Sequence, residues 1–339
     1  MKAANRARTS RRASVIAVTA GDPCGIGTEV LLKALAFIPR ASARLIIIGD
    51  HPAFKTVAAR VHRRLPAWQV VRAGELTVRP SAPLTFLDCG HRQRFILGRT
   101  SREAGAASRG YLDQAIRLWR AGIIDGLVTA PVTKWSIAQT TPTFVGQTEY
   151  LARAMKVRDV AMMFVSDTLR VVLLTRHVPL ADVSRAINRR LITQTMRLTD
   201  KVLRKSFHIR APRIAVCGVN PHAGEAGRCG EEEERVMRPA LRMLRRAGIR
   251  CEGPLAADGL FAAPERYDAI LCAYHDQGLG PFKMAARDRG CQLSVGLPIV
   301  RTSPDHGSAL DIAGKGIAHP GSMRYALQLA IKLAKYRTR

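Results

Sequence analysis

Acidic residues are scarce in this chain of 339 residues: Asp and Glu together number 26 against 54 Lys and Arg, which gives a formal net charge of +28. A positive charge of this size is typical of proteins that bind nucleic acids. Aromatic residues, however, make up only 5% of the chain, too few for a surface that stacks on bases. The basic residues are also scattered along the whole sequence, so we expect no nucleic-acid partner.

Long hydrophobic runs and paired cysteines are missing as well. No apolar run approaches the roughly 18–20 residues that a membrane-spanning helix needs. The seven cysteines are odd in number and form no C-x-x-C pair, which argues against a disulfide framework and against a cysteine zinc site. These absences predict a cytoplasmic protein without a membrane partner.

The amino-terminal segment lacks acidic residues altogether. Residues 1–14 carry five basic side chains, and we expect them to form a disordered basic tail. The apolar stretch that follows, residues 15–20, is shorter than the roughly 7–15 residues of a signal-peptide core. It is therefore interpreted as the first strand of a cytoplasmic protein.

Short β-branched runs alternate with segments of helical periodicity through the rest of the chain. This alternation predicts an α/β protein with a mainly parallel sheet. The expected strands are residues 15–19, 44–48, 126–129, 161–165, 170–174, 213–217 and 269–273. The expected helices are residues 28–36, 109–121, 185–205, 232–247 and a closing helix at 322–336.

Three histidines come directly after apolar runs that look like strands. They are His177 after VVLLTR, His222 after IAVCGVNP and His275 after AILCAY. Ligands bind at the carboxyl ends of the strands in an open parallel sheet, so three imidazoles delivered there could converge on one divalent cation. The alternative for each histidine taken singly is a hydrogen-bonded loop residue.

Polar groups near these histidines extend the candidate site. Asp276 could orient the His275 imidazole, although a helix cap is the alternative. The segment 301–307, RTSPDHG, follows the apolar run at 293–300 and offers the guanidinium of Arg301 together with hydroxyls, groups that suit a phosphate or a carboxylate. Lys283 could supply a second cation.

The glycine-rich loop at residues 21–27 suggests a dinucleotide-binding turn. Its third glycine is missing, because Val30 stands at the expected place, and the fingerprint is therefore incomplete. A tight turn from strand to helix is the preferred interpretation.

Six separated motifs resemble those of one enzyme family. GDPCGIGTE near the start, GQTEYLA at 146–152, TRHVPL at 175–180, NPHAGE at 220–225, YHDQG at 274–278 and LPIVRTSPDHGSALDIAGKG at 297–316 stand in the family's order and at similar spacing. Together they resemble the 4-hydroxythreonine-4-phosphate dehydrogenases of pyridoxal phosphate biosynthesis. The resemblance covers nearly the whole chain after the basic tail.

The resemblance implies a two-domain fold like that of isocitrate and isopropylmalate dehydrogenases, with the active site in the interdomain cleft. We expect residues 15–130 and 305–339 to form a first α/β domain. Residues 131–304 would form a second one, which carries the metal ligands and the dimer interface. The resemblance also implies a homodimer whose active sites combine residues of both subunits.

The family's functional residues fall on named positions of this chain. His177, His222 and His275 match its ligands for a divalent metal, which would be zinc, magnesium or cobalt. Substrate-binding positions are matched by Gln147, Thr148, Lys283, Gln292 and Arg301. The cofactor, NAD or NADP, would lie along stretches that include Gly253, Asp258, Asp305 and Asp311. No catalytic residue is assigned beyond the metal ligands.

The implied reaction oxidises 4-phosphohydroxy-L-threonine to a β-keto acid, which loses carbon dioxide to give 3-amino-2-oxopropyl phosphate. The metal would polarise the substrate hydroxyl, and the nicotinamide would take the hydride. Lys283 and Arg301 would hold the anionic end of the substrate.

Two departures from the family pattern leave other substrates open. Gln147 stands where the family has a histidine, and Gln292 stands where it usually has an asparagine. Glutamine still donates and accepts hydrogen bonds but does not titrate. The alternatives are a related phosphorylated hydroxy acid of the threonate or erythronate type, a dihydrodiol carboxylate, and a basic scaffold protein built on an enzyme fold.

Overall fold

The computed structural model describes residues 13–91 and 93–337, which form one mixed sheet with helices packed on it. The predicted tail at 1–14 lies outside these residues except for Ala13 and Ser14. The strands are β1 Val15–Thr19, β2 Arg44–Gly49, β3 Gln69–Arg72, β4 Leu84–Asp88, β5 Gly126–Thr129, β6 Ala161–Ser166, β7 Arg170–Leu173, β8 Ile214–Cys217, β9 Cys251–Leu255, β10 Ala269–Cys272, β11 Gly290–Val295 and β12 Val300–Pro304.

The helices alternate with these strands along most of the chain. They are α1 Gly27–Leu35, α2 His51–Arg60, α3 Arg102–Arg120, α4 Lys134–Ala138, α5 Gln147–Ala154, α6 Val183–Ala186, α7 Arg189–Lys205, α8 Arg238–Arg246, α9 Ala257–Ala262, α10 His275–Ala286 and α11 Gly321–Arg337. Among the described residues, no helix is both long and apolar enough to cross a lipid bilayer.

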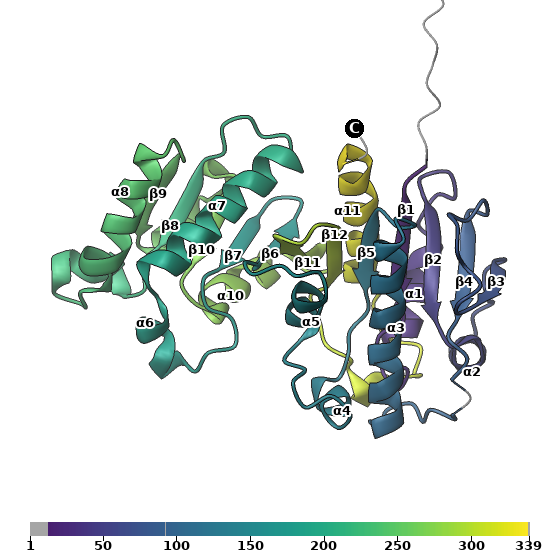
Figure 1. Cartoon of the computed structure of the whole chain (residues 1–339). Helices are drawn as coiled ribbons and strands as arrows, with labels where there is room; N and C mark the ends of the chain where they lie inside the picture. Colours follow the sequence, from purple (N-terminus) through teal and green to yellow (C-terminus); the bar gives the residue numbers. More distant parts are fainter. Residues whose placement is uncertain (1–12, 92, 338–339) are drawn as a thin grey trace, which may run out of the picture.

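The strands lie in the order β3-β4-β2-β1-β5-β12-β11-β6-β7-β10-β8-β9. Neighbouring strands run parallel except where β11 pairs with β12 and with β6, and where β6 pairs with β7. Figure 1 shows these antiparallel strands between two halves of the sheet, with α1 and α3 beside one half and α7 and α8 beside the other. The prediction of an α/β protein with a mainly parallel sheet is confirmed, and the domain boundaries stay a prediction.

The strands that were predicted from apolar runs lie in the core of the protein. Residues 15–18 of β1 and 46–48 of β2 are fully buried, as expected for parallel strands covered by helices on both faces. The predicted closing helix is confirmed as α11, which packs on β5, β11 and β12. Its buried face contains the residues that the helical period predicts: Met323, Leu327, Ala330, Leu333 and Ala334.

Three helix predictions were wrong at their boundaries. The segment 185–205 is broken before Asn188, whose side chain accepts a hydrogen bond from the Leu191 amide and starts α7. Helix α3 begins seven residues earlier than residue 109, at Arg102, because Ser101 caps the Ala104 amide. The segment 232–247 starts with a π-helical turn, Glu233–Met237, before α8.

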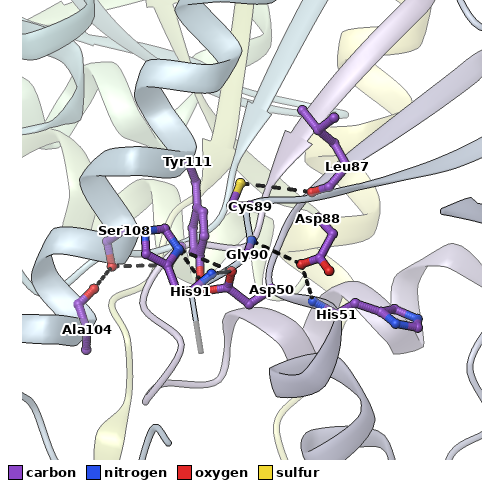
Figure 2. A network of polar contacts seen from close by, with 11 residues as sticks. Asp50, His51, Leu87, Asp88, Cys89, Gly90, His91, Ala104, Ser108 and Tyr111 are labelled. Atoms are coloured by element: carbon purple, nitrogen blue, oxygen red, sulfur yellow. Dashed lines mark hydrogen bonds and ion pairs between the residues drawn. The ribbon is translucent and has the colours of Figure 1, made fainter. Parts of the chain in front are cut away.

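A buried polar network ties the ends of β2 and β4 to α3 (Figure 2). Asp50, which is 1% exposed, accepts hydrogen bonds from the Tyr111 hydroxyl at 2.5 Å and from the His91 amide at 2.9 Å. The His91 ring lies 3.1 Å from the same carboxylate, and this hydrogen bond raises the pKa of His91. The network satisfies a carboxylate that would otherwise be buried without partners.

Candidate functional site

The three predicted histidines follow three adjacent parallel strands. Strand β10 pairs with β7 on one side and with β8 on the other. His177 comes four residues after β7, His275 begins α10 directly after β10, and His222 lies in a short helical turn, Pro221–Gly227, after β8. The sequence-based placement of all three at the carboxyl ends of strands is therefore confirmed.

Two side chains join the loops that carry these histidines. The Thr175 hydroxyl donates to the Ala273 carbonyl oxygen at 2.8 Å, which links the His177 loop to the end of β10. The Gln277 side chain accepts from the Ala273 amide at 2.7 Å and donates to the Gly218 carbonyl oxygen at 2.8 Å. Gln277 thus spans the strand ends that precede His275 and His222.

His177 and His275 lie side by side, with their ring centroids 6.1 Å apart. The Nδ1 atom of His275 is 2.6 Å from the Asp276 carboxylate, so Asp276 orients this ring rather than capping the helix. That contact leaves Nε2 of His275 available to a ligand. Desolvation by the surrounding protein, followed by the charges of Lys134 and His275, lowers the pKa of His177.

His222 is presented by a left-handed turn. The φ angles of His222, Ala223, Glu225 and Ala226 lie between 43° and 56°, and Gly224 between them has a φ of 79°. Left-handed conformations cost a residue with a side chain roughly 1–2 kcal/mol, so the surrounding contacts must hold this turn. Its imidazole is exposed and is not among the groups that line the cavity beside the other two histidines.

The structure brings two of the predicted metal ligands together and leaves the third apart. Within residues 13–91 and 93–337, no group of three or more His, Cys, Asp or Glu side chains is placed so that it could hold a metal ion. A site with three histidine ligands therefore stays a prediction.

A cavity of about 320 Å³ opens beside His177 and His275. Of the predicted substrate-binding residues, Gln147, Thr148, Gln292 and Arg301 line it. Lys283 is not among the lining residues; it is exposed, and its ammonium group donates to the Asp305 carbonyl oxygen at 3.0 Å. The other lining residues are Pro131, Val132, Lys134, Gly146, Glu149, Met162, Phe164, Leu279, Ser303, Pro304, Asp305, His306 and Gly307.

Arg301 is the second residue of β12, and only 2% of it is exposed. Its Nη1 donates to Gln292 at 2.5 Å, to Ser294 at 3.0 Å and to Thr148 at 3.3 Å. Its Nη2 donates to Thr129 at 2.5 Å. Burial lowers the pKa of Arg301 to about 10, so the guanidinium stays positively charged at neutral pH.

Three polar atoms of the lining residues are buried without a hydrogen-bond partner: Oε1 of Gln147, Nε of Arg301 and Nε2 of His306. Buried polar atoms are normally paired, and an unpaired one in a cavity is a candidate contact for a ligand. The set contains an acceptor, a charged donor and an imidazole nitrogen. It is suited to an anionic ligand that also carries hydroxyl or ammonium donors.

Sequence reasoning missed Lys134 and Glu149 as residues of the cavity, and it included His306 only as part of the segment 301–307. Lys134 comes five residues after β5, so the rule about strand ends could have found it. Glu149 accepts from Nη1 of Arg176 at 2.8 Å, and the pair connects α5 to the His177 loop. Sequence periodicity alone gives no sign of such a pair.

The predicted cofactor residues fall into two groups. Asp305 lines the cavity, and Asp311 lies farther along the same segment in a short turn, Leu310–Ile312. Gly253 lies on β9, and Asp258 lies in α9, which packs against the turn that holds His222. The glycine-rich loop forms the expected tight turn and contacts the Asp305–Asp311 segment, because the Ile26 amide donates to the Ser308 carbonyl oxygen at 3.0 Å.

Comparison with models of known protein families assigns the chain to one of them. The family model described as pyridoxal phosphate biosynthetic protein PdxA matches residues 41–330. The chain belongs to this family. Its relatives in the PdxA family include the 4-hydroxythreonine-4-phosphate dehydrogenase of Azoarcus sp. (strain BH72), which is 41% identical over 96% of this chain and 98% of the relative.

Two further relatives of this PdxA family member bear on its activity. A crystal structure of the 4-hydroxythreonine-4-phosphate dehydrogenase of Klebsiella pneumoniae is 31% identical, with a TM-score of 0.83 over 95% of this chain and 99% of that one. The D-threonate 4-phosphate dehydrogenase of Cupriavidus necator is 40% identical over 95% of this chain and 98% of the relative. All three are dehydrogenases, which places the chain among the oxidoreductases.

Proposed function

We propose that the chain is a cytoplasmic, metal-dependent and NAD(P)-dependent dehydrogenase that oxidises 4-phosphohydroxy-L-threonine in pyridoxal phosphate biosynthesis. The observation that carries the proposal is a single cavity lined both by buried Arg301 and by the adjacent imidazoles of His177 and His275. Arg301 and its unpaired Nε fit the anionic part of a phosphorylated acid, and the imidazole pair fits a divalent cation.

The imidazoles of His177 and His275 are of the residue type that binds a divalent cation. Nε2 of His275 is left available by the contact between Nδ1 and Asp276, and His177 lies beside it. His222 would complete the set of nitrogen ligands. When bound, the cation would supply Lewis-acid polarisation of the substrate hydroxyl, and the nicotinamide would accept the hydride.

The chain's own side chains would bind and orient the substrate. Arg301 holds the anion through Nε, since its other nitrogens are bonded to Gln292, Thr148, Ser294 and Thr129. Oε1 of Gln147 accepts a hydrogen bond from a hydroxyl or an ammonium group of the substrate. Oxidation would turn the substrate C–OH group into a ketone, with its hydride accepted by bound NAD(P)+ and its hydroxyl proton released to solvent. The resulting β-keto acid then loses carbon dioxide.

A second substrate, D-threonate 4-phosphate, is favoured by one specific observation. Gln147 is a neutral acceptor that can bind a hydroxyl as well as an ammonium group, and the relative that acts on this substrate is almost as similar as the Azoarcus one. We also propose a homodimer with shared active sites, which analytical ultracentrifugation would test.

The deciding experiment follows NAD(P)H formation by absorbance with each of the two substrates. We expect turnover with a phosphorylated substrate, loss of turnover when a chelator removes the metal, and recovery when zinc, magnesium or cobalt is restored. The variant His177→Ala should lose metal-dependent turnover, whereas His62→Ala, on the surface beyond α2, should not. Turnover that survives both the chelator and His177→Ala would exclude the metal mechanism.

A further inference from the structure

Glu233 is a buried carboxylate that no step of the proposed reaction uses. Its residue is 0% exposed, although it belongs to a run of four glutamates at 231–234. One oxygen, Oε1, accepts hydrogen bonds from the Val219 amide at 2.7 Å and from the Asn220 amide at 2.8 Å. The other oxygen accepts from Nδ2 of Asn220 at 3.0 Å.

These three hydrogen bonds fall directly before the left-handed turn. Val219 and Asn220 connect β8 to His222, and the turn's own backbone adds a bond from the Ala223 amide to the Asn220 carbonyl oxygen at 3.2 Å. Glu233 also lies against the turn itself, because a Cβ atom at Gly224 would be 2.6 Å from Oε2 of Glu233. The Glu233 carboxylate therefore contacts both the residues that lead into the turn and the turn itself.

We propose that Glu233 is a positioning residue that holds the 222–226 turn in its left-handed form and thereby fixes His222 as a ligand for a divalent cation. The inference rests on the proposed function, because it assigns His222 to the metal. A strained turn keeps its shape only when its surroundings determine it, and within the described chain Glu233 is the side chain that bonds both amides leading into the turn.

Gln277 holds the same loop at a second point, the Gly218 carbonyl oxygen. It holds the Gly218 carbonyl oxygen and the Ala273 amide, so the approach to the turn is tied to the strand end that carries His275. Between them, buried Glu233 and half-buried Gln277 hold residues 218–220, which lead to His222. The backbone that leads to His222 is thus held in place before any cation binds.

The test compares Glu233→Gln with Glu234→Gln. The neighbouring Glu234 is exposed and pairs with Arg238, so it is a matched control. In Glu233→Gln one oxygen becomes an NH2 group, which faces either the backbone amides or Nδ2 of Asn220 and cannot accept from them. Cobalt(II) is titrated into each metal-free protein and followed by its visible absorption, and the melting temperature confirms that each variant is folded.

We expect Glu233→Gln to weaken cobalt binding about ten- to a hundredfold, the range typical of residues that orient metal ligands, while Glu234→Gln binds as the wild type does. Cobalt affinity in Glu233→Gln equal to that of the control would overturn the positioning role and leave the proposed function intact. If the wild type does not bind cobalt, or if His222→Ala binds it as tightly, then His222 is not a metal ligand and the proposed metal site is wrong.

A second measurement does not depend on the variant being folded. Hydrogen exchange in the wild-type, metal-free protein should show the Val219 and Asn220 amides strongly protected, because Glu233 holds them before metal is added. Rapid exchange of both amides would mean that the turn forms only on metal binding, which would refute the inference.

Discussion

Gln292 accepts a hydrogen bond of 2.5 Å from Nη1 of Arg301 across the antiparallel pair of β11 and β12. The same amide oxygen accepts from the Ser303 hydroxyl at 2.9 Å, and Nε2 of Gln292 donates to Ser294 at 3.1 Å. Gln292 thus helps to fix the guanidinium of Arg301 from the neighbouring strand.

Replacing Gln292 by leucine should destabilise the protein and weaken substrate binding. The change keeps the volume similar but removes the acceptor from a buried, charged donor, at a cost of about 2 kcal/mol in the free energy of unfolding. Urea denaturation measures this loss, and the KM for the phosphorylated substrate should rise. The control Gln139→Leu, at an exposed position, should change neither quantity; a Gln292→Leu variant as stable as this control would contradict the argument.

Replacing Arg301 by lysine should raise KM more than it lowers kcat. Lysine keeps the charge but cannot bond Gln292, Thr148, Ser294 and Thr129 at once and still reach the substrate. Losing a charge-assisted hydrogen bond worth about 2 kcal/mol corresponds to roughly a thirtyfold loss in kcat/KM. Steady-state kinetics measure this loss in kcat/KM, and Arg289→Lys, at an exposed position, is the control. An unchanged KM would remove Arg301 from anion binding.

Replacing Gln147 by histidine should introduce a pH dependence that the wild-type residue cannot have. An imidazole titrates near about pH 6.5, whereas an amide does not titrate. Below that pH an imidazolium would repel the ammonium group of 4-phosphohydroxy-L-threonine, so the ratio of kcat/KM for this substrate over D-threonate 4-phosphate should fall several-fold from pH 8 to pH 6. Gln139→His provides the control, and a ratio constant with pH in Gln147→His would place residue 147 away from the amino group.

The sequence predicted the strands best where hydrophobic runs are unbroken. Strands β1 and β5 have the predicted bounds, because each is a short, continuous apolar segment between turn residues. The run at 293–300 was harder: it spans the end of β11 and the first residue of β12, with a turn at Gly296, whose φ is 105°. Arg301 therefore lies inside a strand, which periodicity did not indicate.

The sequence predicted which residues lie at the strand ends but not how their side chains come together. Local sequence placed His177, His222 and His275 at strand ends, since strands and the loops after them are encoded by neighbouring residues. Whether the three rings converge depends on loop geometry, and nothing in NPHAGE indicates a left-handed turn in which Gly224 is the only glycine among five residues. The contribution of Glu233 arises from a contact between separate segments, which a local pattern does not show.

Replacing Lys33 by methionine should loosen residues 316–318, which follow the segment that contains Asp305 and Asp311. The ammonium group donates to the Gly316 and Ala318 carbonyl oxygens, both at 2.8 Å, and pairs with the buried Glu29 at 2.7 Å. Its loss leaves the Glu29 carboxylate without a cation and should cost at least about 2 kcal/mol in the free energy of unfolding. If this segment binds the cofactor, KM for NAD(P) should rise while KM for the phosphorylated substrate stays constant.

The matched control for that change is Lys55→Met, because Lys55 is exposed on α2. It should match the wild type in stability and in both KM values. If Lys33→Met is destabilised but keeps the wild-type KM for NAD(P), then Lys33 stabilises the fold and does not contribute to cofactor binding.

Replacing His91 by glutamine should change the pH dependence of stability. The hydrogen bond to Asp50 raises the pKa of His91 in the folded state. A raised pKa means that the stabilisation is fully present below the unfolded value of about 6.5 and is lost as pH rises through the folded value. Because the His91 ring is partly exposed, we expect its charge to add no more than about 1 kcal/mol to the free energy of unfolding.

Glutamine can keep a hydrogen bond to Asp50 but does not titrate, so the variant isolates the charge of His91. The difference in free energy of unfolding between wild type and His91→Gln, measured with urea from pH 5.5 to pH 9, should therefore be largest at the acidic end and shrink as the imidazole loses its proton. His62→Gln, on the surface after α2, should show no such trend. A difference that grows with pH would mean that the neutral ring, and not the imidazolium, is the form that Asp50 stabilises.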